Sequence, residues 1–152
     1  MKRRIKTHYS LVDEIMASPV EPINESLRAG YLRRMWTAYG SLAGIKPSYE
    51  AADVCVDAVA IVELLIATGL AEDSQGLLDD AKRAIGQSVR NYPAGPAVEL
   101  TPEGAFAVQS VLEDYGDLMA QLPARTMIHC HRKVESSRIA AVKKAAGHAK
   151  NI

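Results

Sequence analysis

The sequence predicts an all-α protein, a four- to five-helix bundle with a very apolar central helix. Apolar side chains recur at the three- and four-residue spacing of a helix face along most of the chain, whereas the strict alternation typical of β-strands is nearly absent. Capping residues, glycines and prolines separate the periodic segments. A length of 152 residues with 48% hydrophobic residues is enough for one domain with its own core.

Two helices are expected before the central one. The first covers Tyr9 to Ala17, has a small apolar face and is expected to pack as an arm on the bundle. The second begins somewhere from 19 to 23, because Ser18 to Glu21 has the form of a capping box and Pro22 could instead occupy the first helical turn. Gly44-Ile45 is expected to end this second helix in a Schellman motif.

The central helix is predicted over roughly residues 49–68. Ser48 can cap its N-terminus, and Gly69-Leu70 has the form of a second Schellman ending. Valine, leucine and isoleucine residues leave little room for a solvated face between these two signals. We therefore expect this helix to be buried by the others.

One narrow polar stripe interrupts the apolar surface of the central helix. Glu50, Asp53 and Asp57 lie within about 60° of each other on a helical wheel. A buried carboxylate requires a partner, since burying an unpaired charge is costly. The expected partners are arginines of the preceding helix, Arg28, Arg33 or Arg34.

A fourth helix and a break are expected next. Asp73 or Ser74 can cap a helix that runs to about Tyr92. Asn91 to Pro96 is the clearest break in the chain because it combines two prolines with a glycine. An irregular or briefly extended connector over residues 97–100 should follow.

Two further helices complete the predicted bundle. Thr101-Pro102-Glu103 supplies a cap, a first-turn proline and a first-turn acid for a helix that runs to about Gln121. The last helix covers about 124–146, and residues 147–152 are expected to fray. The apolar side of the earlier helix is expected to include Phe106, Val111, Tyr115 and Met119. The inner side of the last helix is expected to include Met127, Ile128, His131, Val134, Ile139 and Val142.

We expect a single helical domain over residues 1–152, with residues 1–8 as a basic arm. Asp13 and Glu14 fall where a secretion signal would need its apolar core, so no signal is predicted. Acidic residues interrupt the most apolar stretch, Val54 to Ala71, so it is interpreted as a core helix and no membrane association is expected. Cys55 and Cys130 are too few for a disulfide framework, which favours a cytoplasmic location.

Charge is distributed unevenly along a chain whose net charge is zero. Residues 1–47 carry eight basic and four acidic residues, a balance of +4, and residues 48–122 carry three basic and thirteen acidic residues, a balance of −10. Residues 123–152 carry seven basic residues and one acid, a balance of +6. Such asymmetry is typical of internal or homotypic charge pairing, which we favour, or of a nucleic-acid footprint. The candidate partner or nucleic-acid contacts are Arg3, Arg4, Lys6, Arg125, Arg132, Lys133, Arg138, Lys143 and Lys144.

No catalytic or cofactor site is predicted. His129-Cys130-His131 offers three local zinc ligands where a structural site normally has four, and the two histidines would point about 200° apart on one helix. The same segment lacks the third orienting group that a cysteine nucleophile needs. Dinucleotide-binding, phosphate-loop and hydrolase-type glycine motifs do not occur. We therefore expect no enzymatic activity, no metal and no cofactor.

The outline from Leu27 to Arg132 resembles a group of small uncharacterised helical proteins encoded by proteobacterial phages and plasmids. The resemblance rests on an Arg-bearing helix that ends near Leu42, an acidic and apolar helix over 53–66, the restart at Leu100 to Gly104, and the segment Leu118 to Arg132. It implies an accessory protein of a mobile element. Some relatives carry transcription-regulator labels without a visible DNA-binding motif. No activity and no functional residue follow from this resemblance.

The expected function is that of a non-enzymatic interaction or regulatory protein that binds a protein partner, through either the acidic middle or the basic last helix. The alternative is a DNA- or RNA-associated regulator that uses both basic ends. A homodimer is also expected, because small bundles with one strongly apolar helix often complete their burial by self-association. Its interface would be the last helix or the stripe of Tyr31, Met35 and Tyr39.

Overall fold

A computed structural model describes residues 20–44 and 46–150. These residues form five helices and no strand, which confirms the all-α prediction. The helices are α2 (Glu25–Ala43), α3 (Tyr49–Ala67), α4 (Leu78–Ser88), α5 (Pro102–Gln121) and α6 (Ala124–Lys150). The predicted helix over Tyr9 to Ala17 and the arm over residues 1–8 lie outside the described residues.

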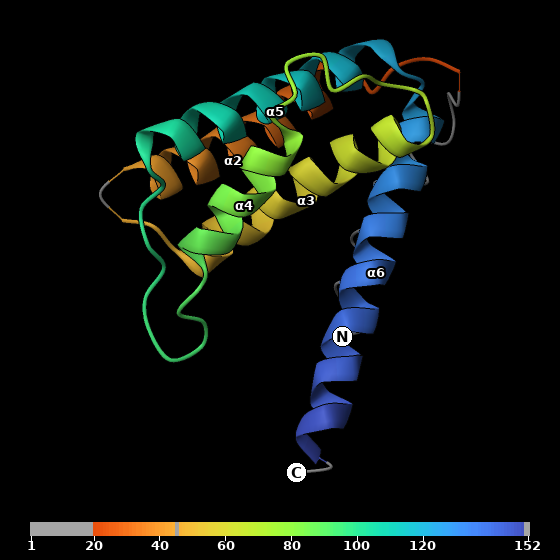
Figure 1. Cartoon of the computed structure of the whole chain (residues 1–152). Coiled ribbons are helices and arrows are strands. Elements are labelled where there is room, and N and C mark those ends of the chain that lie inside the picture. Colours follow the sequence, from red (N-terminus) through yellow and green to blue (C-terminus); the bar gives the residue numbers. More distant parts are fainter. Residues whose placement is uncertain (1–19, 45, 151–152) are drawn as a thin grey trace.

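Helices α2 to α5 pack together, and α3 contacts each of the other four described helices. Figure 1 shows α6 starting against this group and then running away from it. The side chains of Ala52, Cys55 and Leu65 in α3 are fully buried. The central position predicted for this apolar helix is therefore confirmed, and its burial supplies much of the hydrophobic free energy of folding.

Both ends of α3 have the expected capping structure. The Ser48 side-chain oxygen accepts a hydrogen bond from the Ala51 N–H at 3.1 Å. At the other end Gly69 has φ +80°, a left-handed conformation that costs glycine little. The Leu70 N–H donates to the Leu65 carbonyl at 2.9 Å and the Gly69 N–H to that of Ile66 at 3.1 Å, the two bonds of a Schellman motif.

Both ends of α2 differ from the prediction. The helix begins at Glu25 instead of 19–23, because the Asn24 side chain accepts hydrogen bonds from the N–H groups of Ser26 and Leu27 and is the cap. At the other end Gly44 has φ −119° and its N–H bonds to the Ser41 carbonyl. A Schellman motif requires a left-handed residue, so that prediction was wrong.

Helix α4 is shorter at both ends than predicted. Asp73 accepts a hydrogen bond from the Leu77 N–H at 3.2 Å, but it caps a turn in which Gly76 has φ +66°, and α4 itself begins at Leu78. The chain leaves the helix after Ser88, and Tyr92, near which the helix was expected to end, is 68% exposed.

The connector over 97–100 is irregular, as predicted, and it is bonded to two helices. The Val98 N–H donates to the Ser88 carbonyl at 2.7 Å, while the Ser88 hydroxyl donates to the Val98 carbonyl at 2.6 Å. The Leu100 N–H donates to the Leu42 carbonyl at the end of α2, at 3.0 Å. These bonds fix the point at which α5 starts.

Helix α5 has the predicted bounds, and the Thr101 hydroxyl oxygen accepts the Gly104 N–H at 3.0 Å. A Cβ on Gly104 would lie 2.8 Å from the Ala84 Cβ, so the glycine permits close packing of α4 on α5. Phe106 was expected in the core but is 61% exposed. The reason is geometric, because Phe106 lies about 180° around the helix from the buried Tyr115.

Candidate functional site

Helix α6 is the candidate functional element because it leaves the bundle. Only Leu122 and Pro123 separate it from α5. Its first turns are buried, with Met127 fully inaccessible, and beyond them the helix diverges from α3 (Figure 1). It continues to Lys150 instead of ending near 146, so residues 147–150, which were expected to fray, are helical.

Three side-chain contacts join the first half of α6 to the bundle. His131 Nε2 lies 3.0 Å from the Tyr115 hydroxyl of α5, and the His131 ring lies 6.0 Å from the Tyr31 ring of α2. Further along, Arg138 donates a hydrogen bond to Asp57 of α3 at 2.8 Å. The proximal part of α6 is thus joined to three different helices.

The partner of Asp57 differs from the prediction. The sequence favoured an arginine of α2, but Arg138 of α6 forms the hydrogen bond. Arg34 of α2 is near enough to lower the pKa of the Asp57 carboxyl by its charge, after the larger influence of Arg138. The prediction missed Arg138 because sequence spacing alone does not show which side of α3 the last helix covers.

Burial outweighs these attractions in setting the pKa of Asp57. Loss of hydration raises the pKa of this carboxyl above its ordinary value, the charge of Arg138 lowers it, and Asp53 raises it again. The net direction is upward although the Asp57 side chain remains 34% exposed. The Asp57–Arg138 pair therefore orients α6 without making the ionised carboxylate favourable relative to water.

Beyond Arg138 the apolar side of α6 loses its cover. Val134 is partly buried, but Ile139 is 48% exposed and Val142 is 64% exposed. Both residues were predicted to face the core, and that prediction was wrong. The apolar residues keep their helical spacing in the second half of α6. The described part of the bundle no longer lies against this half of the helix (Figure 1).

Basic residues occupy another side of the same helix. Five of the predicted contact residues fall within about 120° on the α6 helical wheel. Four of them are named here as the basic face, and all four are exposed: Arg125, Lys133, Lys143 and Lys144. The fifth, Arg132, is also exposed and has a further interaction of its own.

The remaining predicted contacts do not join this face. Arg138 lies at least about 120° from each of the five and points to Asp57 instead. Arg3, Arg4 and Lys6 lie outside the described residues. The structure thus gathers five of the nine predicted contact residues on one side of one helix and assigns a sixth to an interhelical ion pair.

An acidic patch on the bundle was missed by sequence reasoning, which detected only the acidic balance of the middle segment. The pKa of Asp114 in α5 is raised, first by burial and then by the negative charges of Asp117, Asp73 and Glu113. The charges of the other three acids therefore act on Asp114, and these four residues are named here the acidic patch. The spacing of the three acids within α5 matches neighbouring positions on a helix surface and could have indicated part of the patch.

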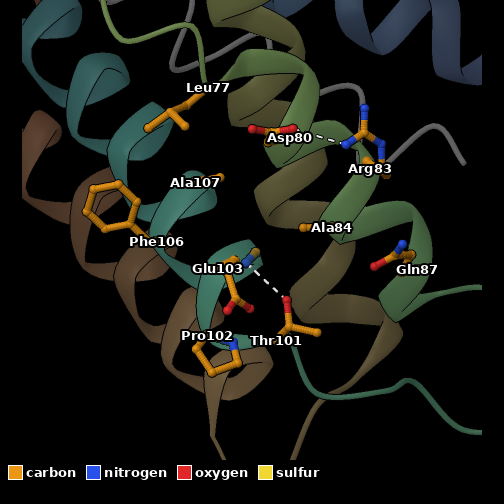
Figure 2. Close-up of a pocket in the computed structure, with 11 residues that line it drawn as sticks. Leu77, Asp80, Arg83, Ala84, Gln87, Thr101, Pro102, Glu103, Phe106 and Ala107 are labelled. Atoms are coloured by element: carbon orange, nitrogen blue, oxygen red, sulfur yellow. Dashed lines mark hydrogen bonds and ion pairs between the residues drawn. The ribbon is translucent and has the colours of Figure 1, made fainter.

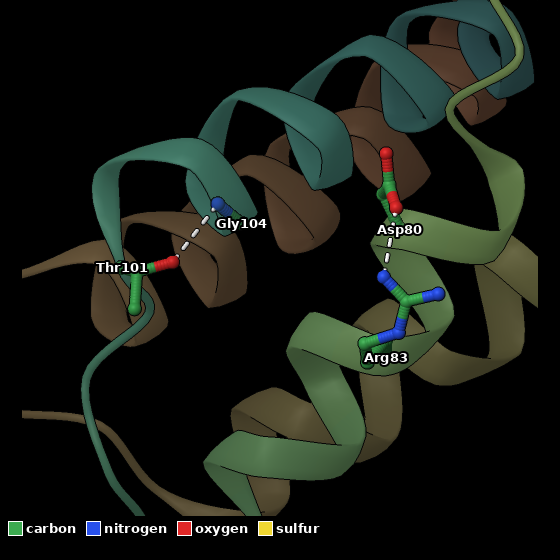
Figure 3. A network of polar contacts seen from close by, with 4 residues as sticks. All are labelled: Asp80, Arg83, Thr101 and Gly104. Atoms are coloured by element: carbon green, nitrogen blue, oxygen red, sulfur yellow. Dashed lines mark hydrogen bonds and ion pairs between the residues drawn. The ribbon is translucent and has the colours of Figure 1, made fainter.

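A groove with a volume of about 640 Å³ lies between α4 and α5 (Figure 2). Some of its polar groups are already paired: Arg83 donates to Asp80 at 3.0 Å, and the Thr101 hydroxyl oxygen caps α5 by accepting the Gly104 N–H (Figure 3). Neither histidine nor cysteine is found among the described side chains that line it. The groove offers carboxylates and a guanidinium but no arrangement of a nucleophile with a base.

The three side chains that were considered as zinc ligands and rejected do not converge. His129 is exposed, Cys130 is buried, and His131 bonds to Tyr115. Burial raises the pKa of the Cys130 thiol, and the charge of Lys133 only partly offsets this effect. Within the part of the chain that the structure describes, no group of three or more metal-ligating side chains occurs.

Comparison of the chain with protein-family models, with curated proteins and with solved structures finds no match. The resemblance to helical proteins of phages and plasmids therefore stays a prediction. None of the described helices combines enough length with enough apolarity to cross a membrane.

Proposed function

We propose that this protein is a non-enzymatic interaction protein that binds a protein partner through the basic face of α6. The supporting observation is the exposure of Arg125, Lys133, Lys143 and Lys144 on one side of a helix that leaves the bundle. The basic side chains of such a helix can be approached from many directions. Long-range electrostatic attraction would bring an acidic surface of a partner toward them.

The acidic patch favours a protein partner over a nucleic acid. A nucleic acid is a uniform polyanion, so contact with α6 would bring phosphates toward a molecule whose residues 48–122 carry a balance of −10. A protein partner can oppose acids to α6 and basic residues to the patch around Asp114. Charge complementarity with both the basic face and the acidic patch therefore requires a partner that carries both signs of charge.

Site-specific photo-crosslinking in cells tests this proposal. A photoreactive residue at Ala140, which is exposed and falls on the basic side of the helical wheel, should capture a discrete protein partner. The same residue at Gln87, exposed on α4, serves as the control. The adduct at Ala140 should disappear when Lys133, Lys143 and Lys144 are changed to Glu. Equal adducts at both positions, or an adduct that survives the triple change, would contradict the proposal.

Association with DNA or RNA is the second candidate function, supported by the same clustering of cations. Fluorescence anisotropy with labelled duplex DNA, single-stranded DNA and RNA separates the two functions. Phosphate-driven binding weakens steeply as salt rises and falls with each lost cation. Binding that persists at physiological salt and is lost in the Lys133, Lys143 and Lys144 to Glu variant would place nucleic acid first. The predicted homodimer is a separate question that sedimentation at several concentrations answers.

A further inference from the structure

The basic face and the acidic patch of one chain do not meet each other. His131 of α6 bonds to Tyr115 of α5, which lies about 100° around α5 from Asp114. Further along, an ion pair joins α6 to α3 and not to α5. Lys143 lies about 18 Å beyond His131 on a helix that runs away from the bundle (Figure 1). The basic face therefore does not reach the acidic patch of its own chain.

Neither surface is neutralised by a described side chain. After burial, the influences on the pKa of Asp114 are the charges of Asp117, Asp73 and Glu113, which are all negative. Glu113 accepts a hydrogen bond from Gln109 at 3.0 Å, but the amide donor carries no charge. The ion pairs between described residues include none of the four acids and none of the four residues of the basic face. Both surfaces therefore remain open to a partner of opposite charge.

Each surface also has an exposed apolar side chain beside its charges. Phe106 lies within about 40° of Glu113 and Asp117 on the helical wheel of α5 and is 61% exposed. Ile139 lies about 40° from Lys143 around α6 and is 48% exposed. A stable contact needs such apolar area, since exposed ion pairs alone contribute little free energy. The two surfaces therefore match in apolar area as well as in charge.

We propose that the projecting half of α6, residues 139–147, docks on Phe106 and the acidic patch of a second copy of this chain. This inference rests on the proposed function and names the protein that the basic face binds. A second copy carries both signs of charge, because it has an acidic patch for α6 and a basic face for the patch. The same two surfaces can thus form the contact twice between two copies.

The charge distribution of the whole chain is compatible with this contact. Its net charge is zero, so two copies meet without overall repulsion. The helix α6 belongs to the segment with a balance of +6, and the acidic patch belongs to the segment with a balance of −10. Pairing between copies therefore brings together the two segments whose charges are most opposed.

Exchanging charges between the two surfaces tests the contact in the full-length protein. The α6 variant carries Lys143→Glu with Lys144→Glu. The exchange variant adds Glu113→Lys and Asp117→Lys to these two changes, so its net charge returns to zero. All four positions are exposed, so the fold should be retained, which circular dichroism checks. Sedimentation equilibrium over a concentration series measures self-association of each protein.

A matched control separates the acidic patch from net charge. It combines Lys143→Glu and Lys144→Glu with Glu25→Lys and Glu50→Lys, which replace exposed acids in the first turns of α2 and α3. Its net charge is also zero, but its acidic patch is unchanged. Acids of α6 would then face acids of the patch, as in the α6 variant.

We expect the wild type to self-associate and the α6 variant to do so at least about tenfold more weakly, because like charges then face each other. The exchange variant should regain association, and the control should not. Monomeric wild type at every concentration would overturn the proposal. Undiminished association of the α6 variant, or equal association of the exchange variant and the control, would overturn it as well.

An apolar substitution gives a second readout at unchanged charge. Phe106→Ala should weaken self-association at least about fivefold, since exposed aromatic side chains often supply much of the binding energy of an interface. Tyr92→Ala is the matched control, because Tyr92 is 68% exposed but lies in the loop after α4. Equal association of the two variants would also contradict docking on Phe106.

Failure of this inference can be told apart from failure of the proposed function. A monomeric wild type whose Ala140 adduct contains a different protein would reject the second copy and retain the proposed function. Absence of any adduct at Ala140 that depends on the lysines would reject both. Gln87, the crosslinking control, lies across the groove from Phe106 (Figure 2), so it is outside the proposed contact.

Discussion

Helices α3 and α6 follow the same helical periodicity but differ in what covers them. The 19 residues of α3 contact all four other described helices, and three of its side chains are fully buried. The 27 residues of α6 are buried only near their N-terminus, and Val142 is 64% exposed. An apolar stripe in the sequence therefore indicates which side of a helix can be buried. Whether that side is buried depends on how the other helices are arranged around it.

The largest expected difference in stability comes from introducing a proline into α3 and, separately, into α6. Ala58→Pro in the buried middle of α3 removes a helical hydrogen bond and creates a steric clash, which costs about 3 kcal/mol or more. Since small domains have about 5–15 kcal/mol of stability, we expect severe destabilisation or unfolding. Ala141→Pro in the exposed half of α6 should lower helicity by circular dichroism but leave the melting temperature of the bundle nearly unchanged. Similar losses of melting temperature in both variants would refute the contrast.

Truncating apolar side chains measures the same contrast without disturbing the backbone. Leu65→Ala should cost about 2–5 kcal/mol in the free energy of unfolding, because Leu65 is fully buried. Val142→Ala should cost less than about 1 kcal/mol, since Val142 is largely exposed in the described structure. Urea denaturation of both variants provides the comparison. A loss above about 2 kcal/mol for Val142→Ala would mean that the far half of α6 is as deeply buried as α3.

The anchoring of α6 can be weakened at one hydrogen bond. Tyr115→Phe removes the hydroxyl that lies 3.0 Å from His131 Nε2 and should lower the free energy of unfolding by about 0.5–1.5 kcal/mol. Tyr92→Phe is the matched control, because Tyr92 is 68% exposed. Hydrogen exchange in α6 should accelerate only in the Tyr115 variant. An unchanged stability would show that this hydroxyl does not help to hold α6.

The smallest expected effect is a pH dependence at the point where α3 and α6 meet. Burial raises the pKa of Asp57 in the folded protein, so its contribution to stability is fully present below the ordinary carboxyl range. That contribution is lost as the pH rises through the raised pKa. Asp57→Asn lacks this titration, so its stability relative to the wild type should increase from about pH 4 to about pH 7.

We expect this increase to be below about 1 kcal/mol, because the Asp57 side chain is 34% exposed to screening solvent. Urea denaturation at the two pH values provides the measurement, with Asp80→Asn on the exposed surface of α4 as a control. A relative stability that decreases over this pH range would show that the attraction of Arg138 exceeds the effect of burial.

Local signals predicted the helices better than their arrangement. Ser48, Gly69 and Thr101 determine helix ends through bonds to nearby backbone groups, and these predictions are confirmed. The start of α2 was missed because the prediction did not consider Asn24, whose side chain caps the helix. Phe106 was misplaced because apolar character was given more weight than its angular position.

The candidate site was predictable in composition but not in geometry. The excess of basic residues near the C-terminus is visible in the sequence, as is their clustering on a helical wheel. The pairing of Arg138 with Asp57, 81 residues away, depends on how α6 crosses α3. The exposure of Ile139 depends on where the described bundle ends beneath α6. The Arg138–Asp57 pairing and the exposure of Ile139 both depend on contacts between segments that are far apart in the sequence. The spacing of apolar residues within one helix does not predict such contacts.

Because α6 is one continuous helix anchored in its first half, the direction of its far side chains is a matter of helical phase. A residue inserted directly after Arg138 would leave the contacts of Tyr115 and Asp57 in place. It would turn everything beyond that point by about 100° and advance it by about 1.5 Å. Composition, net charge and helix length would hardly change. The side chains of Lys143 and Lys144, however, would point in a different direction around the axis of α6.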